Sequence, residues 1–198
     1  MNGERMDSSF RCNQYLLRRQ VLALTGTFRL YDPGGRMLMF SKQKMFRLRE
    51  DIRVYADEGM TQTMLLIKAR NIIDFSAAYD VVDPQSGEKV GVWRRKGWRS
   101  MLRDEWELLD ESDRQIGILV EDSVGYALLR RLLLGNLLPQ NYDLFIGNTR
   151  VGDFRQRFHL FRYELDIDFQ MDTAHMLDRR MGVAAAILLG TIEGKQDS

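Results

Sequence analysis

An uncharged apolar stretch near the C-terminus, residues 181–192, constrains the fold of this chain more than any other feature. Three consecutive alanines lie at its centre, and alanine is the strongest helix former. Because its large apolar residues are not confined to one stripe, the predicted helix is either a core helix or a membrane span. The stretch is shorter than the roughly 20 apolar residues that cross a bilayer. We therefore predict a buried hydrophobic helix over residues 173–193, capped by Asp172 or Thr173 at its start and by Gly194 at its end.

The chain before this helix carries a repeated turn signal. Short segments rich in acids and glycine begin at Asp32, Asp57, Asp83 and Asp110, and these aspartates are 25, 26 and 27 residues apart. Aspartate bonds its own backbone and glycine accepts a positive φ, so each segment favours a hairpin turn. Between the turns, apolar and polar residues alternate in the manner of strands. We predict a mainly β fold: a closed antiparallel barrel of about twelve strands wrapped around the buried C-terminal helix.

Length and charge limit the classes of protein that fit. The 198 residues suit one domain, which we place at residues 15–198 after a polar N-terminal tail at 1–14. The net charge of +1 gives no global field that would attract nucleic acid, so nucleic acid is disfavoured as a partner. The tail has no apolar leader segment, and the single cysteine, Cys12, cannot form an internal disulfide. We expect a cytoplasmic protein that can associate with the periphery of a membrane.

Together these features resemble the tubby C-terminal-like superfamily, and within it the LURP-one-related and phospholipid scramblase branch. The likeness rests on TFRLYDPGG at residues 27–35, DIDFQMD at residues 166–172, and LDRR at residues 177–180 before the apolar helix. The resemblance covers roughly residues 15–194 and implies a twelve-stranded antiparallel barrel around a C-terminal helix. The chain lacks the Pro-rich N-terminal region and the cysteine cluster of the scramblases. The implied fold therefore transfers to this chain better than scrambling activity does.

Four carboxylates form the first candidate site. In the scramblase branch, the acidic segment at this place is implicated in calcium binding, and calcium takes six to eight oxygen ligands. The candidate metal ligands are Asp166, Asp168, Asp172 and Asp178. Their spacing is not that of an EF-hand, and the alternative is structural: a solvent-facing strand, a helix cap and an ion pair with an arginine. Calcium is the one cofactor that we consider.

The second candidate is a basic segment with two tryptophans, which could rest on anionic lipid headgroups. Its residues are Trp93, Arg94, Arg95, Lys96, Trp98 and Arg99. Relatives of the tubby type bind phosphoinositide headgroups through basic residues on the barrel, although their positions cannot be matched here one by one. The alternative is a solvated hairpin end whose tryptophans pack inward.

A third candidate lies at residues 124–138, which lack strand alternation and favour a helical excursion from the barrel. An apolar helix that carries arginines could lie in a membrane interface or bind a partner chain. The residues that we select are Arg130, Arg131, Leu133 and Leu134. The alternative is a helix that plugs one end of the barrel.

We expect a non-enzymatic barrel module that binds phospholipid or phosphoinositide headgroups, or a protein partner, at a membrane surface. The alternatives are a scramblase-like protein with calcium-dependent activity and a soluble interaction protein without a ligand. The sequence contains no glycine-rich phosphate loop, nucleophile elbow or dinucleotide fingerprint, so no residue is assigned a catalytic role.

Overall fold

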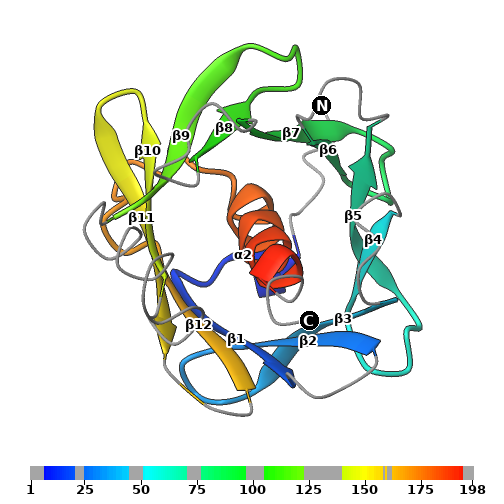
Figure 1. The fold of residues 1–198 in the computed structure, drawn as a ribbon. Coiled ribbons are helices and arrows are strands. Elements are labelled where there is room, and N and C mark those ends of the chain that lie inside the picture. The colour runs from blue at the N-terminus through cyan, green and yellow to red at the C-terminus, as the bar shows by residue number, and fades with distance from the viewer. Residues whose placement is uncertain are drawn as a thin grey trace.

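A computed structural model of the chain describes residues 7–20, 25–44, 51–70, 77–96, 105–122, 140–157, 159 and 162–193. Within these residues, twelve strands form one closed antiparallel barrel around a long helix (Figure 1), which confirms the predicted fold class. The strands are β1 (Gln14–Gln20), β2 (Thr25–Tyr31), β3 (Met37–Lys44), β4 (Ile52–Tyr55), β5 (Thr63–Ala69), β6 (Ala78–Val82), β7 (Lys89–Arg95), β8 (Glu105–Leu109), β9 (Gln115–Glu121), β10 (Asn141–Ile146), β11 (Thr149–Arg157) and β12 (Arg162–Asp168). The central helix is α2 (Arg179–Glu193), and a 3₁₀ turn, η1 (Ser8–Phe10), precedes β1.

The barrel is a simple meander in which every strand pairs with the next one along the chain. It closes where β1 pairs with β12. Side chains alternate across its wall, as strand geometry requires. On β12, for example, Tyr163, Leu165 and Ile167 are buried in the interior, whereas Asp166 and Asp168 are only partly buried. One face of each strand therefore belongs to the core and the other is available to solvent.

The predicted acidic turns form one rim of the barrel, here named the short-turn rim. The four predicted turns are residues 32–36, 56–62, 83–88 and 110–114, and a fifth turn on the same rim, at residues 147–148, contains no acid. The leading aspartates work as the sequence predicts: Asp32 accepts a hydrogen bond from the Arg36 N–H, and Asp110 accepts from the Arg114 N–H, each at 2.9 Å. The opposite rim, here named the far rim, contains the ends of β1, β7, β9 and β11 and the start of β12.

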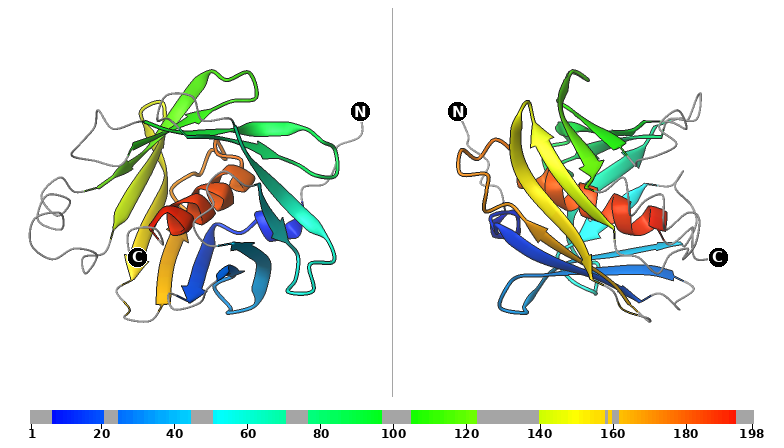
Figure 2. Two further views of the ribbon diagram at one scale, coloured as in Figure 1. Left: turned by 45° about the vertical axis from the view of Figure 1, so that its right-hand side comes forward. Right: turned by 60° about the vertical axis from the view of Figure 1, so that its left-hand side comes forward.

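Helix α2 starts at the short-turn rim and lies along the inside of the barrel (Figure 2). Residues 181–190 are buried without interruption, which matches the uncharged stretch of the sequence. The fit to the wall is close: a Cβ atom on Gly182 would lie 2.3 Å from Cζ of Phe169. Glycine at this position lets the helix approach the aromatic ring, so the packing of the helix depends on a missing side chain.

The helix begins six residues later than the sequence predicts, at Arg179 instead of residue 173. Asp172 does accept backbone hydrogen bonds, but they come from Met176 and Leu177 in the turn before the helix. Asp178 is the residue that caps α2, since its carboxylate accepts from the Arg180 N–H at 2.9 Å. Both aspartates can cap a helix. Asp172 does not cap α2 because its carboxylate is bound in the preceding turn.

Residues 7–13, which the sequence places in a polar tail, pack against the barrel. Phe10 is buried in the core cluster, and the Tyr15 hydroxyl donates to the Ser9 carbonyl at 3.0 Å. Asn13 accepts a hydrogen bond from Arg179 at the start of the helix. These contacts attach residues 7–13 to the barrel and to the start of its central helix. The predicted excursion at residues 124–138 lies outside the described residues.

Candidate functional site

The basic segment that begins at Trp93 was predicted to face lipid headgroups, but its first tryptophan faces the interior of the barrel. Trp93 is completely buried, and its indole N–H donates to the Met181 carbonyl of α2 at 3.0 Å. Its ring therefore cannot lie in a membrane interface while the helix occupies the barrel. Residues Trp98 and Arg99 lie outside the described residues.

The described cations of this segment already have interactions within the protein. Arg94 forms an ion pair with Glu107 at 2.5 Å, and Lys96 hydrogen-bonds to Glu105. The hydrogen bond to Glu105 is the main cause of the raised pKa of Lys96. Arg95 lies over the ring of Trp106, with Cζ 6.0 Å from the ring centroid. An anionic ligand would have to compete with two carboxylates here.

The four candidate calcium ligands do not converge. Asp166 is held by two nitrogens of Arg157, at 2.5 and 2.6 Å. Asp168 accepts from the Gln14 side chain, and Asp178 is occupied at the start of α2. Across the described residues, no three His, Cys, Asp or Glu side chains come close enough together to hold a metal ion. The carboxylates that were predicted to bind calcium instead accept hydrogen bonds from donors of the protein.

Asp172 has the most demanding structural role of the four. It pairs with Arg179 at 2.6 Å, and the two side chains are only 1% and 7% exposed. Burial alone would raise the pKa of Asp172, but the hydrogen bonds from Arg179 and from the Met176 and Leu177 amides lower it overall. The Arg179 guanidinium also lies over the ring of Phe169, with Cζ 4.9 Å from its centroid. This buried pair joins the start of the helix to the barrel wall.

The next arginine ties the helix to a hairpin. Arg180 forms ion pairs with Asp178 at 2.6 Å and with Asp83 of the β6–β7 turn at 2.9 Å. The sequence LDRR at residues 177–180 is therefore a docking motif of the fold, and its charges are used inside the protein.

A group of arginines that the sequence did not single out forms a small pocket on the barrel near the far rim. The pocket has a volume of about 170 Å³ and is lined by Arg18, Arg19, Arg29, Tyr31 and Arg162. Small-molecule clefts have volumes of roughly 300–1,000 Å³, so this pocket has room for one ionic group. We name it the arginine pocket.

Three adjacent strands supply the arginine pocket. Arg18 of β1 stands directly opposite Arg29 of β2 in the strand register, and Arg162 is the first residue of β12. Like charges directly opposite each other on neighbouring strands are destabilising. Places where a local rule is broken are often functional or strained, so we treat this position as a candidate site. Guanidinium groups bind phosphate and carboxylate with paired hydrogen bonds, so the arrangement suits an anion.

Two of the pocket's arginines are held by ion pairs with carboxylates. Arg18 bonds Glu164 at 3.0 Å and lies over the Tyr31 ring, with Cζ 5.1 Å from the centroid. Arg29 bonds Glu58 at 2.7 Å, and this hydrogen bond raises the pKa of Arg29. Arg162 is exposed and makes no ion pair with another described residue.

Arg19 differs from its neighbours because it occupies an inward position of β1. Its side chain is buried, and its Cζ lies 5.5 Å from the centroid of the Tyr163 ring. An arginine at an inward position of an alternating strand was the one local signal in the sequence for this site. Arg18 and Arg29 lie on consecutive strands of the meander, and Arg162 joins them only because β1 pairs with β12.

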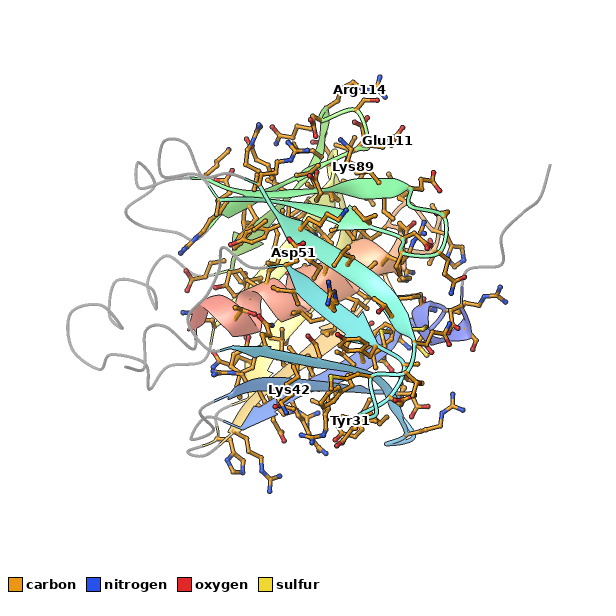
Figure 3. The ribbon with its side chains drawn as sticks, turned by 90° about the vertical axis from the view of Figure 1, so that its right-hand side faces the viewer. Tyr31, Lys42, Asp51, Lys89, Glu111 and Arg114 are labelled. Carbon is orange, nitrogen blue, oxygen red and sulfur yellow. The ribbon has the colours of Figure 1, made fainter. Side chains whose placement is uncertain are left out.

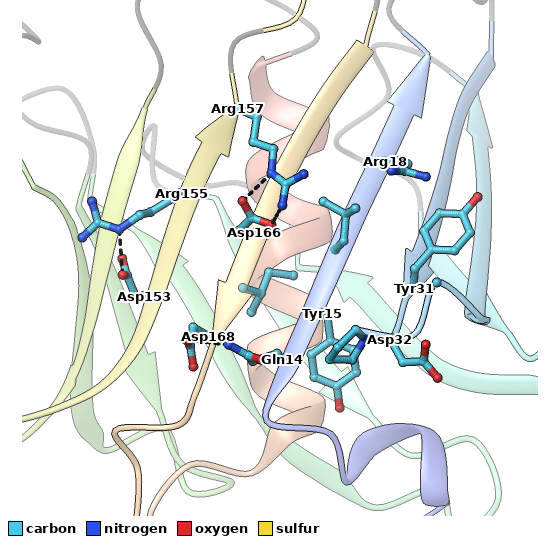
Figure 4. A pocket seen from close by; sticks show the side chains of 14 residues that line it. Gln14, Tyr15, Arg18, Tyr31, Asp32, Asp153, Arg155, Arg157, Asp166 and Asp168 are labelled. Carbon is cyan, nitrogen blue, oxygen red and sulfur yellow. Dashed lines mark hydrogen bonds and ion pairs between the residues drawn. The ribbon is translucent and has the colours of Figure 1, made fainter.

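A larger groove adjoins the arginine pocket on the outer face of β11, β12, β1 and the β2–β3 turn (Figure 4). Its volume is about 630 Å³, within the usual range of ligand clefts. Arg18 and Tyr31 line both cavities. Two arginines of the groove are bound to carboxylates, Arg155 to Asp153 at 2.8 Å and Arg157 to Asp166.

The fold and this surface define a closed antiparallel barrel that is filled by its own C-terminal helix and carries an arginine-lined pocket on its wall. Residues 37–189 match the family model described as LURP-one-related. The chain belongs to the LURP-one-related family, as the resemblance predicted. No curated protein and no solved structure matches this chain.

The candidate interfacial residues Arg130, Arg131, Leu133 and Leu134 lie outside the described residues. None of the helices in the described part of the chain is both long enough and apolar enough to cross a membrane.

Proposed function

We propose that this protein is a non-enzymatic barrel module that binds the phosphate of an anionic phospholipid headgroup, of the phosphoinositide type, in the arginine pocket. The observation that carries the proposal is the convergence of arginines from three adjacent strands, with Arg18 directly opposite Arg29. A bound phosphate would turn this repulsion into attraction, because it accepts hydrogen bonds from several guanidinium groups at once.

The position of the pocket supports a membrane surface as the source of the phosphate. Arg18 and Arg162 lie close to the far rim, where β7 and β9 end. The segments that follow these two strands in the sequence, residues 97–104 and 123–139, contain a tryptophan, several leucines and four arginines. Segments that combine aromatic, apolar and basic residues are typical of proteins that rest on anionic bilayers.

Co-sedimentation with vesicles tests the proposal. Wild-type protein is compared on neutral phosphatidylcholine vesicles and on vesicles that also contain phosphatidylinositol or its phosphorylated forms, at low and high salt. We expect binding only to the anionic vesicles, weakened by salt because exposed charges are screened. Binding should be the same with calcium and with a chelator, since the aspartates have protein donors.

The decisive variant is Arg18→Glu combined with Arg162→Glu. A hydrogen bond to a charged group contributes about 1.5–3 kcal/mol, so we expect the affinity for anionic vesicles to fall at least about tenfold. Arg114→Glu is the matched control for each of the two substitutions made singly: it makes the same charge change as either one, at a side chain that is 76% exposed on the short-turn rim. Figure 3 shows Arg114 on the opposite side of the barrel from Tyr31 of the pocket. Equal binding by the double variant and the control would contradict the proposal.

A further inference from the structure

The groove beside the arginine pocket differs from it in chemistry. Beyond Arg18, its charged side chains toward the short-turn rim are carboxylates, and its arginines 155 and 157 are already bound to Asp153 and Asp166. Figure 4 shows Gln14 and Asp168 together at one end of the groove, with Asp32 beside them. The oxygens of all three side chains can accept hydrogen bonds from hydroxyls, and the charges of Asp32 and Asp168 repel a second phosphate.

The groove is also long enough to hold an organic group attached to a phosphate in the arginine pocket. Gln14 and Arg18 both line it and are four residues apart on β1, which corresponds to roughly 13 Å at about 3.3 Å per residue. Leu16 lies between them, paired with Tyr31 on one side and Asp166 on the other. The floor is therefore apolar at its centre, with hydrogen-bond acceptors at its far end.

We propose that the groove binds the neutral, hydroxylated body of a polyol monophosphate, such as inositol monophosphate, whose single phosphate lies in the arginine pocket. This inference rests on the proposed function and narrows its ligand class. The pocket takes one anionic group, the apolar floor contacts the carbon ring, and Gln14, Asp32 and Asp168 bind hydroxyls. A polyphosphate would place further negative charge against these carboxylates.

Calorimetric titration of the full-length protein with soluble probes tests this specificity. The probes are inorganic phosphate, myo-inositol 1-phosphate and inositol hexakisphosphate. We expect inositol 1-phosphate to bind at least about tenfold more tightly than inorganic phosphate, and at least as tightly as the hexakisphosphate. Affinity that rises steadily with the number of phosphates would overturn the proposal, because a plain basic patch behaves in that way.

Leu16→Trp separates the groove from the pocket, since it fills the groove without a change of charge. We expect this variant to lose the advantage of inositol 1-phosphate while its affinity for inorganic phosphate stays within about twofold of wild type. If wild type binds inorganic phosphate and the inositol ring adds nothing, the groove proposal fails and the arginine pocket stands. If no phosphate compound binds, the proposed function fails as well.

The source of the polyol phosphate is tested by competition. Displacement of the protein from phosphatidylinositol vesicles by free inositol 1-phosphate would show that the lipid headgroup uses this site. Tight binding of the free compound with no binding to vesicles would support the groove and assign it a soluble ligand. Vesicle binding that free inositol 1-phosphate does not displace would overturn the assignment of the headgroup to the groove.

Discussion

The two faces of strands β12, β1 and β2 follow opposite rules. On the inner face, Tyr163, Leu17 and Phe28 enclose Gly190 of the helix so closely that a Cβ there would lie 2.8 Å from Cε1 of Phe28. On the outer face of the same strands, Arg18 stands opposite Arg29, against the usual preference for unlike charges. The inner face has no room for a further atom at Gly190. The outer face places two like charges opposite each other, and each is paired with a carboxylate, Glu164 or Glu58.

The arginines at the start of α2 and those of the arginine pocket differ in a similar way. Arg179 and Arg180 pair with carboxylates and are only 7% and 17% exposed. Arg18 and Arg29 of the pocket also pair with carboxylates, but they are 42% and 29% exposed. The exposure of an arginine, rather than its presence in a basic segment, therefore separates the arginines that hold the protein together from those that a ligand can reach. The LDRR motif belongs to the first group and the arginine pocket to the second.

The largest expected effect is on the buried pair. Asp172→Ala leaves the Arg179 guanidinium buried without its carboxylate, which should cost about 3–5 kcal/mol of unfolding free energy. Asp166→Ala is the control, because it removes an outer pair in which the side chains are 52% and 41% exposed. Exposed pairs contribute about 0–1 kcal/mol. Urea unfolding of both variants measures the difference, and equal losses would refute the distinction between the two faces.

Gly190→Ala tests the close packing of the inner face. Alanine is favoured over glycine in a helix by roughly 1 kcal/mol, so an unconstrained helix would gain stability. Here the added methyl group meets Phe28 and Tyr163, and we expect a net loss of about 1–3 kcal/mol from overpacking. Combination with Phe28→Leu should recover part of this loss. A more stable Gly190→Ala single variant would show that the helix is not held as tightly as described.

The pH dependence of stability sharpens the assignment of the buried pair. The pKa of Asp172 is lowered in the folded protein, and an aspartate in an unfolded chain has a pKa of about 3.9. The stability that the ionised carboxylate contributes is therefore complete above this value and is lost as the pH falls through the lower native pKa. We expect the difference in unfolding free energy between wild type and Asp172→Asn to shrink from pH 6 to pH 2. A constant difference would contradict the role of the charge.

The smallest effect concerns the outer face. Inorganic phosphate at ten times its dissociation constant should stabilise the native protein by about 1.4 kcal/mol, which corresponds to a rise in Tm of about 3–6 °C for a chain of this size. Arg162→Glu should unfold within about 0.5 kcal/mol of wild type, as exposed sites do, and should lose the rise in Tm with phosphate. Thermal melts with and without phosphate check both statements, with sodium chloride at equal ionic strength as the control.

The sequence predicted the barrel and its helix because both depend on local patterns. An uncharged stretch of twelve residues, period-two alternation and regularly spaced acidic turns are all readable without tertiary information. The start of the helix could not be predicted from such patterns, because Asp172 and Asp178 can both cap a helix. Phe10 was missed for a similar reason, since one apolar residue in a polar segment has no periodicity to show that it is buried.

The candidate site could not be predicted in the same way. The segment at Trp93 attracted attention because its charges are adjacent in the sequence, yet its first tryptophan faces the helix and two of its cations pair with carboxylates on β8. The arginine pocket joins residues from the two ends of the described barrel, Arg18 and Arg162. These residues become neighbours only through the pairing of β1 with β12.

The most direct test of this account is to follow the side-chain Nε–H signals of the arginines by NMR while inorganic phosphate is added. We predict that the signals of Arg18, Arg29 and Arg162 shift together and saturate, while those of Arg179 and Arg180 stay in place. Shifts confined to Arg94 and Arg95, or no saturable shift at the three pocket arginines, would contradict the assignment of the anion site to the outer face of β12, β1 and β2.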